Sequence, residues 1–239
     1  MTFVETSVSR DIFRTIDLAR ELQKNGAIVG RPGVGKSFAL AAYVKAANEG
    51  IHFDRPVSFF TVTAITGNAL RDLFREVANS MSMSIDGSLA NMQRQMMQYD
   101  LSGRALIIDE AQNLKLQAFR ELLHLHDFTN MSLIFCGNSE VLKRVNTDKG
   151  VFAQISRRVP IRAEVNSILD EDIDRLSNTF GVEGLDAYKM LRLIGRAHHT
   201  DGVVSVLEVA RRFASNRVIK SEHIRRACEP FPHYRSALK

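Results

Sequence analysis

The chain has 239 residues, 45% hydrophobic and 25% charged, which are ordinary globular values that exclude a disordered tail protein or a collagen-like fibre. Two widely separated cysteines, Cys136 and Cys228, exclude a disulfide framework and a clustered zinc site, and they favour a reducing compartment. The net charge of +5 arises in residues 190–239, which hold ten Lys and Arg against four Asp and Glu; a polyanion partner such as DNA and a helical domain with solvated arginine faces both account for it.

Short apolar or β-branched runs recur along the first two thirds of the chain and predict strands buried on both faces of a parallel sheet. Helical patterns lie between them, and this alternation predicts an α/β fold, a three-layer sandwich around a five-stranded parallel sheet. The predicted strands are residues 27–29, 57–63, 105–108, 132–136 and 159–165, and the predicted helices are residues 37–48, 68–80, 89–99 and 116–127.

The strand pattern stops after about residue 167, where helical patterns take over. Gly181, Gly184 and Gly202 are interpreted as stop signals between these helices, and Ser221 as the N-cap of the last one. We expect the two prolines from Pro230 onward to end the fold. The predicted helices are residues 170–180, 186–197, 203–215 and 221–228, and the predicted parts are an α/β core at 1–167, a small all-helical domain at 168–229 and a C-terminal tail at 230–239.

One segment between the first predicted strand and helix matches G-x-x-x-x-G-K-[ST] in full. Glycines allow the backbone to approach phosphates with its N–H groups pointing inward. Lysine supplies a charge to the β- and γ-phosphates, and the serine hydroxyl is a Mg²⁺ ligand at a helix N-terminus, where the dipole also favours anions. The predicted ATP-binding residues are Gly30, Arg31, Pro32, Gly33, Val34, Gly35, Lys36 and Ser37.

Two carboxylates follow a buried strand 73 residues beyond Lys36. Open α/β sheets bind ligands at the carboxyl ends of their strands, so Asp109 and Glu110 are placed for this site. We expect Asp109 to hold Mg²⁺, through water, and Glu110 to orient or deprotonate the attacking water, because phosphoryl transfer requires mainly positioning and charge neutralisation.

Three further residues are catalytic candidates. Asn138 follows the fourth predicted strand, where its amide would contact phosphate or water; a turn-forming Gly-Asn pair is the alternative. Arg157 and Arg158 precede the fifth strand, and either could reach the γ-phosphate of a neighbouring subunit as an arginine finger. Two ordinary surface arginines are the alternative.

Together, the phosphate loop, the acidic pair, the polar strand end, the arginine pair and the helical domain resemble the AAA+ ATPase family of P-loop proteins. Within it, the chain is most similar to the phage Mu B-type and TnsC/TniB-type transposition ATPases. The residues that carry this closer resemblance are Phe3–Thr6 leading into a helix, the segment Gly26–Ser37, and Asp109–Leu114.

The resemblance implies an enzyme that binds ATP and Mg²⁺, hydrolyses ATP slowly, and is stimulated by DNA or a partner. It implies head-to-tail assembly into rings or helical filaments on double-stranded DNA of any sequence, because heterologous interfaces propagate. It also implies a role in transposition, with recruitment and activation of a transposase. The sequence shows no segment of ~18 apolar residues that could span a membrane and no secretory signal, so a cytoplasmic location is expected.

Two departures from the family pattern matter. Many family members carry an arginine at the start of the third helix of the helical domain, but the segment Gly202–Val206 has none, which indicates slow turnover. Only 29 residues precede Gly30, so we expect the N-terminal helix-turn-helix domain of Mu B-type proteins to be absent.

DNA contacts are then expected from the α/β core. Hydroxyls and helix starts after the second strand could hold phosphates without reading sequence, although an amphipathic surface helix is an equally good account of any single residue. The candidates are Thr66, Asn68, Arg71, Arg75, Arg94 and Lys115.

Two other functions stay open. One is a different AAA+ role, as a replication initiator, helicase loader or secretion-associated ATPase. The other is a nucleotide-gated binding switch with negligible turnover, which the missing arginine favours and the intact Lys36, Asp109 and Glu110 oppose.

Overall fold

The computed structural model describes residues 3–51, 56–146, 151–215 and 217–238. The chain forms two compact units, which are described separately: an α/β unit of residues Asp11–Gly30 and Ser37–Val165, and a helical unit from Asn166 onward. The helical unit also takes in the segment up to Arg10 and the loop Arg31–Lys36.

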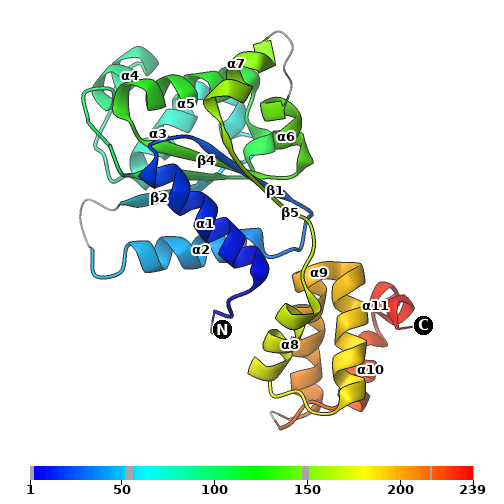
Figure 1. The fold of residues 1–239 in the computed structure, drawn as a ribbon. Helices are drawn as coiled ribbons and strands as arrows, with labels where there is room; N and C mark the ends of the chain where they lie inside the picture. The colour runs from blue at the N-terminus through cyan, green and yellow to red at the C-terminus, as the bar shows by residue number, and fades with distance from the viewer. Residues whose placement is uncertain (1–2, 52–55, 147–150, 216, 239) are drawn as a thin grey trace. The chain divides into compact units, whose positions relative to one another are not determined.

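The α/β unit is built on one five-stranded sheet with all strands parallel, in the order β2-β3-β4-β1-β5 (Figure 1). This confirms the predicted fold class, and each predicted strand is present within two residues of its expected bounds. The strands are β1 (Gly26–Gly30), β2 (Val57–Thr61), β3 (Ala105–Asp109), β4 (Ser132–Gly137) and β5 (Ile161–Val165).

Helices cover both faces of the sheet, which gives the three layers (Figure 1). They are α1 (Ser7–Glu21), α2 (Lys36–Ala47), α3 (Leu70–Ser80), α4 (Leu89–Met96), α5 (Leu116–Thr129), α6 (Ser139–Asn146) and α7 (Val151–Arg158), with short 3₁₀ turns at Thr66–Asn68 and Ala111–Asn113. The sequence patterns missed the short helices α6 and α7.

The main core lies between the sheet and helices α3, α4 and α5. Phe119 of α5 stacks on Phe135 of β4 with ring centroids 4.0 Å apart, and both side chains are fully buried. Met92 and Met96 of α4 are buried in the same cluster. The core holds the central strands firmly, and therefore fixes the positions of the loops at their carboxyl ends.

The helical unit consists of α8 (Asp170–Thr179), α9 (Leu185–Phe213), α10 (Ser221–Cys228) and α11 (Pro232–Ala237). The longest of these, α9, is two helices in sequence, because His199 interrupts it with φ 57° and ψ −158°. The predicted stop at Gly202 is wrong, since this residue is buried inside the second helix and the break falls three residues earlier. A glycine alone did not end the helix, because packing decides where the chain bends.

Two further expectations about this unit are corrected. Lys220, not Ser221, is the N-cap of α10. The tail does not end the fold at Pro230, because Pro232 starts α11 and Tyr234 is buried in the core of the unit. A proline in the first turn of a helix loses no hydrogen bond and has the φ angle that the helix requires, which explains why this proline begins a helix. Lys239 of the predicted tail lies outside the described residues.

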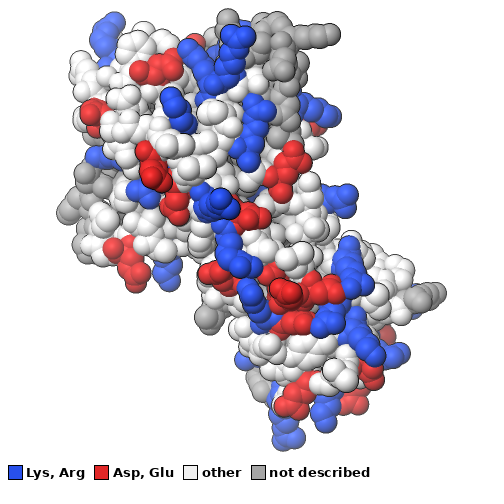
Figure 2. Space-filling view, viewed as in Figure 1, with Lys and Arg blue, Asp and Glu red and all other residues white. Residues whose placement is uncertain are grey.

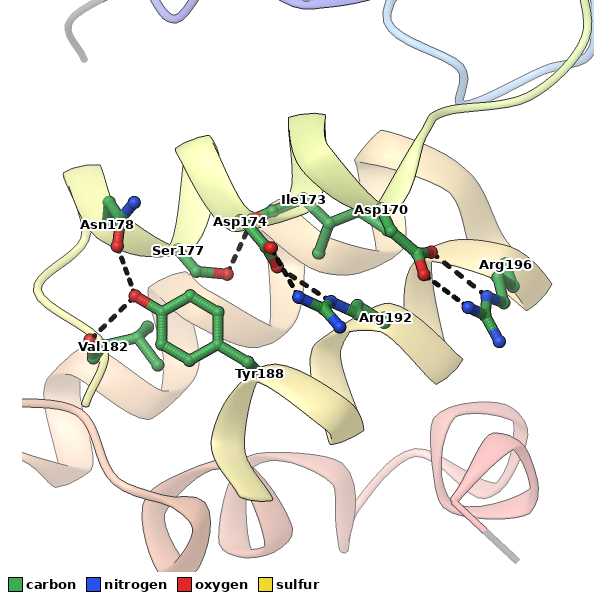
Figure 3. A network of polar contacts seen from close by, with 9 residues as sticks. All are labelled: Asp170, Ile173, Asp174, Ser177, Asn178, Val182, Tyr188, Arg192 and Arg196. Carbon is green, nitrogen blue, oxygen red and sulfur yellow. Dashed lines mark hydrogen bonds and ion pairs between the residues drawn. The ribbon is translucent and has the colours of Figure 1, made fainter. Parts of the chain in front are cut away.

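Paired polar side chains join α8 to α9 in the helical unit (Figure 3). Arg192 donates two hydrogen bonds to Asp174, at 2.9 and 2.6 Å, and Arg196 donates one to each carboxylate oxygen of Asp170. Tyr188 donates to Asn178 at the other end of α8. These bonds fix the register of the two helices.

Among the described residues, no helix is long and apolar enough to cross a membrane.

Candidate nucleotide site

The predicted phosphate loop leaves β1 at Gly30 and enters α2 at Lys36. Gly33 and Gly35 have φ angles of +78° and +103°, which only glycine adopts readily. The loop therefore needs these glycines for its shape. Lys36 donates from Nζ to the carbonyl oxygen of Arg31 at 3.0 Å, so its ammonium group is folded back along the loop.

The acidic strand end of β3 contacts the start of α2. Ser37 Oγ donates to Asp109 Oδ2 at 2.8 Å, and the backbone N–H of Glu110 donates to Asp109 Oδ1 at 2.9 Å. Asp109 is only 3% exposed, so its carboxylate is buried and fully hydrogen-bonded. The contact brings together two residues that are 72 positions apart in the sequence.

A hydroxyl and one carboxylate are the right donors for Mg²⁺. This ion takes oxygen ligands in an octahedron, keeps several waters, and usually needs only one or two protein carboxylates besides substrate phosphates. The hydrogen-bonded pair of Ser37 and Asp109 fits that requirement. Ser37 would hold the ion and Asp109 would orient the serine and a bound water.

Glu110 is held by a residue that the sequence patterns did not single out. Gln112 donates from Nε2 to Glu110 Oε2, and its Oε1 accepts from the backbone N–H of Asn138 at 3.3 Å. A side chain at Gly137 would collide with Gln112, because a Cβ there would lie 2.2 Å from Gln112 Oε1. Gln112 thus connects the carboxylate to the end of β4. A glutamine two residues after an acidic pair gives no recognisable signal in one sequence.

The backbone of Glu110 is also unusual, with φ 56° and ψ 36° in the left-handed region. Non-glycine residues adopt this region rarely, at a cost of about 1–3 kcal/mol, and such residues gather at functional sites. The turn directs the Glu110 side chain toward Gln112.

Asn138 lies at the end of β4, which is between β1 and β3 in the sheet. Its side-chain oxygen accepts from the N–H of Glu140 at 2.8 Å, and it therefore caps α6. The amide group Nδ2 is not used in this cap. Asn138 therefore has a structural role at the start of α6.

The two candidate arginines at the end of α7 differ in their surroundings. Both are exposed, and Arg158 forms an ion pair with Asp127 of α5 at 2.8 Å. Arg158 is therefore already engaged within its own chain.

The helical unit contributes residues to the loop that the sequence patterns missed. Thr200 Oγ1 donates to the carbonyl oxygen of Val34 at 2.9 Å, and the N–H of Asp201 donates to the carbonyl oxygen of Gly33 at 2.9 Å. The helical unit thus binds the loop through a hydroxyl and a backbone amide. The break at His199 places these two residues, and no local pattern reveals it.

Residues 19–145, more than half of the chain, match the AAA domain family. This chain belongs to that family.

Three phage and prophage proteins are similar to most of this chain. The "ATP-dependent target DNA activator B" of Escherichia phage Mu is 24% identical over 217 residues, which cover 89% of this chain and 66% of that protein. The protein of the same name from Escherichia phage D108 gives the same figures. The "Mu-like prophage FluMu DNA transposition protein B" of Haemophilus influenzae is 24% identical over 76% of this chain and 62% of its own length. The resemblance to Mu B-type ATPases is thereby confirmed, and the chain spans just under two thirds of these relatives.

Solved structures confirm the fold. Cdc6p from Pyrobaculum aerophilum has a TM-score of 0.70 at 15% identity, over 96% of this chain and 69% of that one. The ADP form of the Aeropyrum pernix ORC2 protein has a TM-score of 0.67 at 16% identity, over 96% and 69%. At these identities, the likeness bears on the fold alone.

The predicted DNA contacts of the AAA domain fall on two connected loops and two helices. Thr66 and Asn68 use their side chains inside their own loop: Thr66 bonds to Thr63, and Asn68 donates to the carbonyl oxygen of Ala64 at 2.6 Å. The N–H of Lys115 donates to the carbonyl oxygen of Gly67 at 3.1 Å, which brings Lys115 to the same loop. Ile65 at its tip is 78% exposed.

The remaining DNA candidates lie on helix surfaces. Arg71 and Arg75 are exposed on α3, where Arg75 pairs with Asp72 at 3.6 Å, and Arg94 is exposed on α4, where it bonds to Asn91. On the face drawn in Figure 2, basic side chains lie among acidic ones rather than in one continuous stripe.

Proposed function

We propose that this protein is an ATPase that binds Mg²⁺-ATP through the phosphate loop and the acidic end of β3. The hydrogen bond between Ser37 and Asp109 carries this proposal, because it pairs the two oxygen donors that a phosphate-bound Mg²⁺ requires. Lys36 neutralises the β- and γ-phosphates, Asn138 donates to phosphate or water, and Glu110 activates the attacking water.

The test compares two variants in a phosphate-release assay and a nucleotide-binding titration. Glu110→Gln should bind Mg²⁺-ATP like the parent protein but lose turnover by at least about a hundredfold, because the general base is gone. Lys36→Ala should weaken binding itself. Glu208→Gln, which changes an exposed residue of α9, is the control and should leave both unchanged. Full turnover in Glu110→Gln would remove Glu110 from the mechanism.

The proposal includes assembly on DNA and a regulatory role in transposition. Support comes from the names of the relatives, a target DNA activator in phages Mu and D108 and a DNA transposition protein in Haemophilus influenzae. The loop of Thr66 and Lys115 adds support, because Ile65 and Lys115 are exposed there. The protein would form head-to-tail rings or filaments on double-stranded DNA and recruit a transposase.

Electron microscopy with double-stranded DNA and a slowly hydrolysed ATP analogue tests the assembly. Rings or filaments should form with nucleotide and DNA together and should be absent with Lys36→Ala. Arg71→Ala and Lys115→Ala should weaken DNA binding uniformly across sequences and reduce its salt dependence, since phosphate contacts carry no sequence information. Single particles under every condition would contradict this part of the proposal.

A nucleotide-gated switch with little turnover is a second candidate. It is favoured by the contact of the helical unit with the loop through Thr200 and Asp201 rather than through an arginine. Steady-state phosphate release with and without DNA separates the two: an ATPase should be stimulated by DNA, and a switch should release no phosphate in either case.

A further inference from the structure

The break in α9 lies beside the phosphate loop and has a residue with an unusual backbone at its centre. His199 has φ 57° and ψ −158°, a conformation that is essentially restricted to glycine. The two residues that follow are fastened to the loop, because Thr200 and Asp201 both hydrogen-bond to loop carbonyl oxygens. The imidazole of His199 is therefore placed next to the loop by bonds on its own chain neighbours.

A pocket of about 340 Å³ opens at this point, within the helical unit and its loop. Its walls include Pro32 and Gly33 of the loop, His198 and His199 of α9, and His233 and Tyr234 of α11. His198 Nε2 lies 3.1 Å from the carbonyl oxygen of His233. A carbonyl only accepts, so His198 Nε2 carries a hydrogen and this ring is fixed in place. The imidazole of His199 also lines the pocket, and no hydrogen bond of its ring is seen among the described residues.

The charges around His199 oppose its protonation. Burial is the largest cause that lowers the pKa of this imidazole below its ordinary value. The positive charges of Arg31, His198 and Lys36 lower it further, in that order. The loop contributes Arg31 and Lys36, α9 itself contributes His198 and the carboxylate of Asp201, and α11 contributes His233 across the pocket. With the loop free of anions, His199 is therefore neutral at neutral pH.

A nucleoside polyphosphate on the loop would reverse this balance. Its several negative charges neutralise Arg31 and Lys36, and the field at the imidazole then favours the protonated ring. We propose that His199 is a positioning residue that takes up a proton from solvent when a nucleoside polyphosphate binds the loop, so that its imidazolium strengthens nucleotide binding. The inference rests on the proposed function, since it requires that the loop binds a nucleotide.

Linkage gives the sign of the effect. A group that is more easily protonated in the bound state makes binding tighter as pH falls through its bound-state titration range. One fully coupled proton changes the affinity by up to about tenfold per pH unit. The nucleotide's own phosphate titration adds to this, but it is the same for the parent protein and for every variant.

The experiment is calorimetric titration of the full chain with Mg²⁺-ADP and with a slowly hydrolysed ATP analogue at several values between pH 6 and pH 8. Two buffers of different ionisation heat give the number of protons taken up per nucleotide. The parent protein should take up a measurable fraction of a proton, and His199→Gln should lose that fraction and flatten the pH profile. His124→Gln, which changes an exposed residue of α5, is the control and should match the parent.

A second variant guards against misfolding. His199→Gly removes the imidazole and suits the backbone conformation, so it should fold at least as well as the parent. Retained proton uptake in both His199 variants, with nucleotide binding intact, would overturn the inference and leave the proposed function standing. Failure of the folded parent protein to bind either nucleotide would overturn both.

Discussion

Gln112 is the residue that shapes the candidate catalytic carboxylate. It bridges Glu110 and the backbone of Asn138, and Gly137 leaves it the room to do so. Neither spacing nor residue type marks it in the sequence, whereas the phosphate-loop residues follow a fixed pattern that is readable without a structure. A side chain that acts by holding another side chain becomes visible only when both are placed.

Gln112→Ala should reduce the turnover number about tenfold, which corresponds to about 1.4 kcal/mol of lost transition-state stabilisation. The Michaelis constant should change little, because Gln112 positions Glu110, whose proposed role is in the chemical step. Steady-state kinetics check this, with Gln98→Ala at the exposed end of the α4 region as the control. An equal change in the control, or a rise confined to the Michaelis constant, would contradict the positioning role.

At the scale of elements, two ion pairs hold α8 against α9. The hydrogen-bonded guanidinium of Arg196 lowers the pKa of Asp170 below its ordinary value of 3.8. Burial acts in the opposite direction, and the charge of Arg192 adds to the lowering. A lowered carboxylate pKa stabilises the folded state above the unfolded value and ceases to do so as pH falls through the folded value. The pair of Asp170 and Arg196 therefore stabilises the folded state at neutral pH.

Arg196→Gln should lower the thermal midpoint at pH 7 by about 2–5 °C, within the range of exposed pairs, and the difference from the parent should shrink toward zero near pH 3. Thermal unfolding followed by circular dichroism at both pH values measures this. Arg211→Gln, exposed on the same long helix, should show no pH-dependent difference. If the loss in thermal midpoint is the same at both pH values, the ionised carboxylate of Asp170 does not account for it.

The start of α1 is fastened to α8 by one buried side chain. Asp172 is 1% exposed and accepts from both the N–H and the hydroxyl of Ser7, as well as from the N–H of Leu169. It therefore serves the first turns of two helices that are far apart in the sequence.

Asp172→Ala should lower the free energy of unfolding by about 2–4 kcal/mol, because three donors lose a charged acceptor. Urea unfolding gives this value, and Asp186→Ala, exposed in the first turn of α9, is the matched control. A loss below about 0.5 kcal/mol would show that water replaces the carboxylate.

Elements differ in how far the sequence predicts them. The strands β1, β3 and β4 are apolar runs that end in a polar or glycine residue, β2 is rich in β-branched and aromatic residues, and β5 alternates, so all five were predicted within two residues. The break at His199 was not, because Gly202 carries the ordinary stop signal and tertiary contacts with Gly33 and Val34 decide the bend instead. The helix α11 was missed because prolines were interpreted as an end rather than a start.

At the scale of the whole molecule, assembly would make one subunit complete the site of the next. Arg157 is exposed at the end of α7, while Arg158 is paired with Asp127, so Arg157 is the better candidate for a finger that acts in a neighbouring subunit. The sequence could not choose between them, because the ion pair joins residues 31 positions apart.

Arg157→Ala alone should lose turnover at least about tenfold with unchanged stability, since an arginine finger stabilises the transition state. An equimolar mixture of Arg157→Ala with Glu110→Gln should recover part of the activity, because each subunit supplies what the other lacks. Phosphate release from the mixture measures this, and Arg158→Ala should retain turnover and lose at most about 1 kcal/mol of stability. No recovery in the mixture would place the arginine's action within one chain.

The hydrogen bond from the Asp201 amide to the carbonyl of Gly33 has a practical consequence. A phosphate that draws the loop's N–H groups inward must rotate the peptide units on which those carbonyls lie, and this bond then lengthens or breaks. The backbone N–H of Asp201 should therefore respond to a phosphate bound in the loop. Its resonance in a ¹⁵N–¹H spectrum and its rate of exchange with deuterated solvent would then measure phosphate binding without an attached probe.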